Sequence, residues 1–131
     1  MSKIGARELS FKLVFGLLFN DTCDNTIVIQ EGIEQNIIAP DEQRDVEKLY
    51  LIVRENLQNI KTKLTSSLKN SMAFKDIYPI DSAILLCGIA EIDYLGENKA
   101  IVINECVKLA KKYSTEKSPS FINGVLSSIY K

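Results

Sequence analysis

The side chains with which this 131-residue chain could do chemistry are lysines, carboxylates and scattered aromatics, because the sequence contains no histidine. That absence removes the commonest general base, the commonest zinc ligand and every Ser-His or Cys-His nucleophile pair. The three cysteines, Cys23, Cys87 and Cys106, form no CxxC pair, and an odd count argues against a disulfide framework. We therefore expect no catalysis, no metal site and no cofactor.

The residue types of this chain are better suited to binding than to catalysis. RNA recognition needs cations for phosphates and planar groups for unstacked bases. Each kind of residue also has a structural interpretation. Lysines near the C-terminus of a helix interact favourably with the helix dipole, and an aromatic residue next to a link can be part of the hydrophobic core. Candidates for an RNA surface lie near both ends of the chain: Lys3, Arg7, Lys12, Lys111, Lys112, Lys117 and Phe121.

A second candidate surface would bind a protein. The first predicted helix carries more apolar side chains than one side of a small helical bundle should bury, at Phe15, Leu18 and Phe19. All three could also be core residues. The net charge is −1, whereas nucleic-acid-binding domains are usually basic. Any RNA contact must therefore come from local patches.

The elements that must position these residues are helices. Residues 2–19 carry two neighbouring apolar stripes, which indicates a helix that is central in its bundle or covered by a partner. Residues 41–69 repeat apolar residues every three or four positions, as one long helix or as two joined near Asn56 to Asn59. Pro79 opens a further helix over residues 80–94.

Two more helices are predicted within residues 101–130, joined by the polar link Ser114 to Pro119. Ser118 is the expected N-cap, with Pro119 at the first helical position. Gly124 interrupts the last helix at a cost of about 1 kcal/mol relative to alanine. The simplest reason for that glycine is close approach of another backbone.

A short helix is also predicted where Ile29, Ile33 and Ile37 recur at intervals of four. The fold class is therefore all-α, with six to seven helices and almost no alternating pattern of strand length. No apolar run reaches the ~18 residues of a membrane span. The N-terminus shows no signal-peptide pattern, so a cytoplasmic protein is the expectation.

Four short motifs resemble a known family. The runs INE at residues 103–105, LAKKYSTE at 109–116 and FINGVL at 121–126 are similar, in letters and spacing, to the C-terminal signature of NusB transcription antitermination factors. ARE at residues 6–8 resembles the family's N-terminal signature. The resemblance spans almost the whole chain and is weakest between about residues 20 and 75.

The resemblance implies two packed helical subdomains, at about residues 1–70 and 71–131. It implies an RNA surface for single-stranded boxA RNA that includes Arg7, Lys111, Lys117 and Phe121. It also implies docking of NusE, a small-subunit ribosomal protein, on Phe15, Phe19 and Asp81. Such a complex would mark ribosomal RNA leaders and keep RNA polymerase from terminating.

The chain departs from the family pattern at two places. Residues 2–5 stand where relatives commonly carry a run of arginines, and Pro119-Ser120 replaces a common His-Lys pair. A helical interaction domain that has lost RNA binding therefore remains an alternative. The RNA-binding module of a ribosomal RNA methyltransferase is another, although no Gly-rich loop follows a strand here. Some relatives self-associate, so a homodimer is also possible.

Overall fold

The computed structural model describes residues 4–19, 25–36 and 38–131. Within these residues the chain forms α-helices and short 3-10 helices and no strand, which confirms the all-α prediction. The elements are α1 (Ile4–Phe19), α2 (Asn25–Glu34), η1 (Pro40–Glu42), α3 (Gln43–Glu55), α4 (Leu57–Ser66), η2 (Phe74–Asp76), α5 (Pro79–Asp93), α6 (Lys99–Tyr113) and α7 (Ser118–Ile129).

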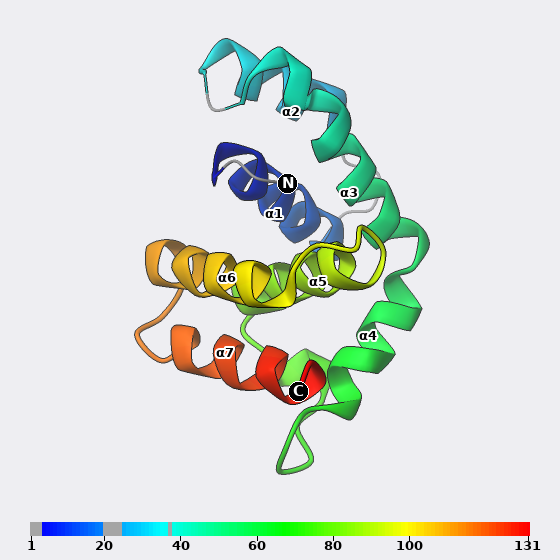
Figure 1. Cartoon of the computed structure of the whole chain (residues 1–131), viewed down its shortest axis with the longest axis vertical. Coiled ribbons are helices and arrows are strands. Elements are labelled where there is room, and N and C mark those ends of the chain that lie inside the picture. Colours follow the sequence, from blue (N-terminus) through cyan, green and yellow to red (C-terminus); the bar gives the residue numbers. More distant parts are fainter. Residues whose placement is uncertain (1–3, 20–24, 37) are drawn as a thin grey trace.

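Helix α5 is the centre of the fold. Every residue from Asp81 to Glu91 is buried, so this helix has no solvent face along three turns. It packs against α1, α3, α4, α6 and α7. In Figure 1 it lies in the middle of the molecule. A helix whose side chains are mostly apolar or small on all sides must be surrounded by other helices, because burial of apolar surface is the main contribution to the stability of the fold.

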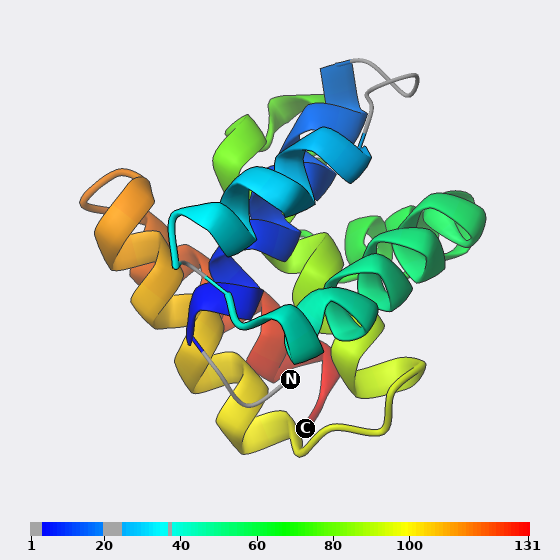
Figure 2. The same ribbon diagram turned by 90° about the horizontal axis from the view of Figure 1, so that it is seen from above.

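Helix α1 is the second buried element. It packs against α5 and α3, and α2 crosses it on one side (Figures 1 and 2). Val14 is fully buried, and Leu9, Phe11 and Leu13 are each at most 4% exposed. The sequence left two alternatives open for this helix, and burial within the bundle holds for most of its length, while Phe19 at its end is 67% exposed.

The long apolar repeat of residues 41–69 is two helices. Asn56 separates α3 from α4, with φ −116° and ψ 19°. Its side-chain amide donates a hydrogen bond to the carbonyl of Ile52 at 2.9 Å. Asparagine side chains that bond nearby backbone groups compete with the hydrogen bonds of a helix. This explains why the apolar repeat, which the sequence allowed to be one helix or two, is interrupted here.

The close approach of another backbone that was predicted at Gly124 is absent there, and it is side chains that crowd another glycine, Gly88. No heavy atom would lie within 4 Å of a Cβ at Gly124, so that prediction is wrong. A Cβ at Gly88 would lie 2.8 Å from the Sγ of Cys106 and 3.6 Å from Leu126. Gly88 therefore allows α6 and α7 to pack closely on α5. Cys106 and Cys87 are buried, as expected for small apolar residues.

Among the described residues, no helix is long and apolar enough to cross a membrane. The segment between α4 and α5, residues 67–78, contains η2 and passes the last helix. The division into two subdomains near this segment stays a prediction.

Candidate nucleic-acid and partner interface

Tyr113, at the end of α6, lies at the contact between α1 and α6. The Nζ of Lys12 lies 5.2 Å from the centre of its ring, and the Nζ of Lys112 lies 5.3 Å from it. The ring of Phe11 packs against it with centroids 5.1 Å apart. Two exposed lysines from opposite ends of the sequence are thus held beside one half-buried aromatic ring, each at cation–π distance.

Glu8 ties this cluster together. Its carboxylate accepts hydrogen bonds from Lys112 Nζ at 2.7 Å and from the hydroxyl of Tyr113 at 2.9 Å. Burial opposes ionisation of Glu8, but the hydrogen bonds from Lys112 and Tyr113 outweigh it and lower the pKa of Glu8. The hydrogen bond to Glu8 likewise raises the pKa of Lys112. Both side chains are therefore charged at neutral pH, and the lysine is held in a fixed position.

Arg7 lies beneath the surface. Its side chain is 5% exposed, and its Nε lies 3.2 Å from Oε1 of Glu91 on α5. Burial raises the pKa of Glu91, and the neighbouring guanidinium of Arg7 opposes that rise. Arg7 also borders a cavity of about 160 Å³ whose other lining residues include Lys108 and Lys112. Its main observed role is to anchor α1 to α5, and direct contact with RNA stays a prediction.

Asp81 is buried at the start of α5. Its Oδ1 accepts a hydrogen bond from the Ser114 hydroxyl at 2.6 Å, and its Oδ2 accepts one from Ser118 at 2.9 Å. Ser118 is the first residue of α7, and its Oγ is within 2.8 Å of Thr115 Oγ1. The Ser118 side chain therefore binds another helix, not its own N-terminus, and its predicted role as N-cap is wrong. Asp81 itself is 5% exposed, so a contact with a partner protein stays a prediction.

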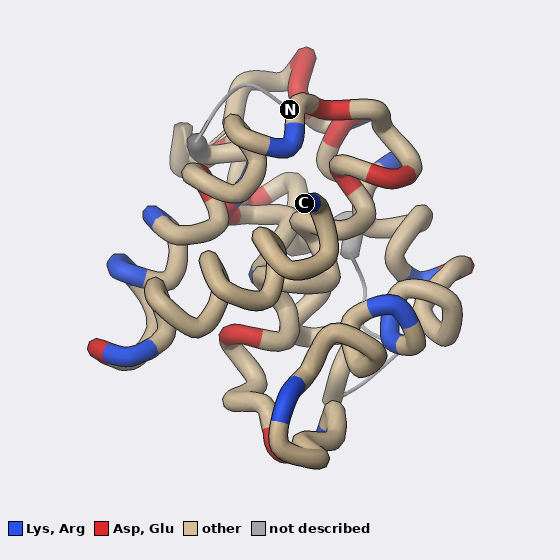
Figure 3. Tube along the Cα trace, turned by 60° about the horizontal axis from the view of Figure 1, so that its bottom comes forward, with Lys and Arg blue, Asp and Glu red and all other residues tan. Residues whose placement is uncertain are grey.

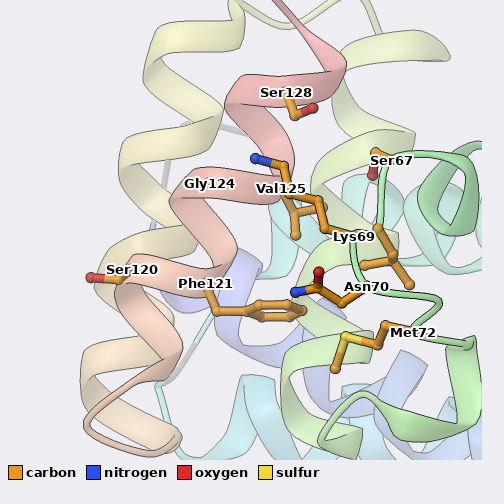
Figure 4. Close-up of a pocket in the computed structure, with 10 residues that line it drawn as sticks. Ser67, Lys69, Asn70, Met72, Ser120, Phe121, Gly124, Val125 and Ser128 are labelled. Carbon is orange, nitrogen blue, oxygen red and sulfur yellow. The ribbon is translucent and has the colours of Figure 1, made fainter.

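Phe121 is half-buried near the start of α7. Figure 4 shows its ring pointing from α7 toward Asn70 and Met72, in the segment that follows α4. These residues line a largely apolar pocket of about 380 Å³, to which Lys69 also belongs. The ring thus closes part of the core and also lines an open pocket.

Two of the remaining candidate cations, Lys111 and Lys117, are exposed. Lys111 borders a groove of about 430 Å³ between α6 and α7, and Lys117 lies in the link before α7. In Figure 3, lysine and arginine positions are spread over several segments instead of covering one face of that view. Lys3 lies outside the described residues.

One face of α1 joins the two candidate surfaces. Glu8, Lys12, Phe15 and Phe19 follow one another at intervals of three and four residues, which places them along one stripe of the helix. The rings of Phe15 and Phe19 contact each other with centroids 5.0 Å apart, and Phe19 is 67% exposed. Leu18 is half-buried. The lysine cluster therefore continues into an exposed aromatic end.

Sequence reasoning missed several residues of this interface. Glu8 and Tyr113 lie inside the ARE and LAKKYSTE motifs but were not selected, because neither spacing nor charge shows that the two motifs meet. Asn70 and Met72 gave no usable signal, since their relation to Phe121 arises only from the fold.

The comparisons with known proteins agree on one family. A model of the NusB family matches residues 5–131. The transcription antitermination protein NusB of Pediococcus pentosaceus is 35% identical over 127 residues, covering 95% of this chain and 94% of that protein. NusB of Campylobacter hominis is 39% identical over 103 residues, covering 79% and 78% of the two chains.

Solved structures give the same result. A structure of antitermination factors NusB and NusE in complex with dsRNA has a TM-score of 0.82 and 26% identity, covering 97% of this chain and 94% of that chain. The solution structure of NusB from Aquifex aeolicus has a TM-score of 0.79 and 27% identity, covering 97% and 86%. This chain belongs to the NusB family of transcription antitermination proteins.

Proposed function

We propose that this protein binds boxA-type single-stranded RNA together with NusE and so supports transcription of ribosomal RNA. The observation that carries the proposal is the cluster in which Lys12 and Lys112 flank the ring of Tyr113. It supplies two cations for phosphates beside an aromatic ring, and α1 and α6 hold all three side chains in place.

Further candidate RNA contacts extend from this cluster. Lys111 and Lys117 are exposed on the α6–α7 side of the molecule, and Phe121 offers a half-buried ring at the start of α7. Few cations are gathered in one place, and the chain carries a net charge of −1. We therefore expect the isolated chain to bind RNA weakly.

The partner surface is proposed at the end of α1. Phe19 is 67% exposed and contacts Phe15, and Leu18 lies beside them. Exposed aromatic anchors next to polar residues are typical of protein-binding sites. A basic ribosomal protein such as NusE would also be attracted to an acidic chain. Because the same stripe of α1 carries Lys12, NusE bound there would extend the RNA surface.

The mechanism that follows is assembly of an adaptor in the cytoplasm. The chain and NusE together would present one RNA-binding surface, which holds boxA-containing transcripts near RNA polymerase. Each step is binding, and none requires a reaction on a covalent bond.

The first test substitutes the two lysines of the cluster. Lys12→Ala and Lys112→Ala should each weaken binding of boxA RNA in the presence of NusE, and each should reduce the slope of log K against log salt by about 0.7. The slope is measured by fluorescence anisotropy over a salt series. Lys48→Ala, which removes an exposed lysine from α3, is the control and should change neither quantity.

A second candidate function is a helical protein-interaction domain without RNA binding. The burial of Arg7 and the engagement of Lys112 with Glu8 favour it, because both reduce the free positive charge of the surface. In that case the lysine variants and the parent would bind RNA equally poorly, while binding of the partner protein would persist.

A further inference from the structure

A single buried carboxylate joins three helix ends. Asp81 lies in the first turn of α5, Ser114 directly follows α6, and Ser118 begins α7. Both serine hydroxyls donate to Asp81, at 2.6 Å and 2.9 Å. The two serine oxygens are also 2.8 Å apart, so the three side chains form one compact polar cluster.

The link between α6 and α7 is fixed by these contacts. Ser114 and Ser118 bracket its three exposed residues, Thr115, Glu116 and Lys117. The backbone N–H of Thr115 donates to Ser118 Oγ at 3.2 Å, which closes the turn. Asp81 is thus bound to both ends of a segment that otherwise faces solvent.

The contacts of Asp81 with Ser114 and Ser118 also fix the positions of the two nearest candidate RNA residues. Lys117 directly precedes Ser118, and the backbone N–H of Phe121 bonds the carbonyl of Lys117 at 3.2 Å. Any shift of Ser118 therefore moves the lysine and reorients the first turn of α7, which carries the aromatic ring.

We propose that Asp81 is a positioning residue for RNA binding, whose carboxylate holds the α6–α7 link in the conformation that presents Lys117 and Phe121 to the RNA. The inference rests on the proposed function of this surface, and it assigns Asp81 a role that requires no contact with RNA or with NusE.

A carboxylate suits this position for two reasons. It accepts at both oxygens, so both serine hydroxyls can donate to it, and negative charge is favourable in the first turn of a helix. An asparagine has the same shape but only one side-chain acceptor oxygen, so one serine loses its acceptor. Because a hydrogen bond to a charged group is stronger than a neutral one, Asp81→Asn weakens the junction with little change in volume.

The experiment compares the full-length parent with Asp81→Asn. We expect RNA affinity in the presence of NusE to fall about tenfold, as for loss of one charge-assisted hydrogen bond. Amide hydrogen exchange should become faster in residues 114–121 and stay unchanged in α1. Binding of NusE in the absence of RNA should be unaltered. Ser118→Ala, which removes one donor and keeps the carboxylate, should give the same pattern and replaces Asp81→Asn if that variant does not fold.

Double-mutant cycles separate positioning from general loss of structure. Phe121→Ala should cost less affinity in the Asp81→Asn background than in the parent, because the ring is already displaced there. Lys12→Ala should cost the same in both backgrounds, because its cluster lies at the α1–α6 contact. A pattern in which Asp81→Asn also diminishes the effect of Lys12→Ala would contradict positioning and indicate general destabilisation.

Other outcomes also overturn the inference. Unchanged exchange in residues 114–121, or weaker NusE binding without RNA, would show that Asp81 acts elsewhere or contacts the partner. If the parent binds RNA and Asp81→Asn binds it equally well, the inference alone fails. If the parent does not bind boxA RNA with NusE at all, the proposed function fails, and the inference falls with it.

Discussion

Buried polar and small residues set the geometry of this protein. Arg7 and Glu91 connect α1 to α5, and Asp81 connects α5 to the α6–α7 link. Gly88 lets α6 approach α5, since a side chain there would meet Cys106. None of these roles follows from residue type alone, because each depends on a partner from another helix. Arg7 was expected to contact RNA, and the family resemblance placed Asp81 at the partner surface, whereas the fold buries both.

The contrast between two glycines gives a direct test of packing. Gly88→Ala should lower the free energy of unfolding by about 1–3 kcal/mol, because its Cβ would lie 2.8 Å from Cys106 Sγ. Gly124→Ala is the matched control and should raise the free energy of unfolding by about 1 kcal/mol. No heavy atom would lie within 4 Å of the added Cβ, and alanine favours the helix. Urea unfolding followed by circular dichroism measures both. Equal destabilisation by the two variants would contradict this account.

The lowered pKa of Glu8 predicts a pH-dependent contribution to stability. A carboxyl whose pKa is lowered by folding stabilises the native state above its unfolded pKa, near the ordinary value of 4.5. That contribution is lost as pH falls through the lower pKa of the folded state. The difference in unfolding free energy between the parent and Glu8→Gln should therefore be present at pH 7 and shrink below pH 4.5.

Glu55→Gln, at an exposed position of α3, is the control for the pH series. The Glu8→Gln difference is compared with the Glu55→Gln difference at each pH. A Glu8→Gln difference that stays constant from neutral to acidic pH would show that the hydrogen bonds from Lys112 and Tyr113 do not favour the charged form.

At the scale of elements, periodicity predicted the helices and turn chemistry limited where they end. The break between α3 and α4 falls at Asn56, inside the region that the sequence marked for a possible kink. The start of α7 was also located, but Ser118 bonds Asp81, which is 37 positions away, instead of capping its own helix. Local rules find a helix end, but they do not reveal a competing long-range partner.

Helix α1 has both a core side and an exposed aromatic end, so one variant can test its partner surface separately from its packing. Phe19→Ala should weaken NusE binding about tenfold or more, because exposed aromatics often act as interface anchors. Isothermal calorimetry measures the affinity. Ile101→Ala, at a 57% exposed position on α6, is the control and should bind NusE like the parent. Unaltered binding by Phe19→Ala would place the NusE surface elsewhere.

At the scale of the whole molecule, folding brings the two ends of the sequence together. Lys112 and Glu8 are 104 positions apart in the chain, and their side chains are 2.7 Å apart. The sequence motifs predicted the fold and indicated that α1 and the α6–α7 region share a function. They could not show which lysines are paired with acids, because that depends on how α6 packs against α1. The net charge of −1 remains the main reason to expect dependence on a partner.

The most direct test of the central claim measures the affinity of labelled boxA RNA for the parent chain with and without NusE, from low to physiological salt. The account predicts weak binding by the chain alone, tighter binding with NusE, and affinity that falls as salt rises because phosphate contacts release counterions. Absence of binding at low salt, even with NusE present, would contradict the account.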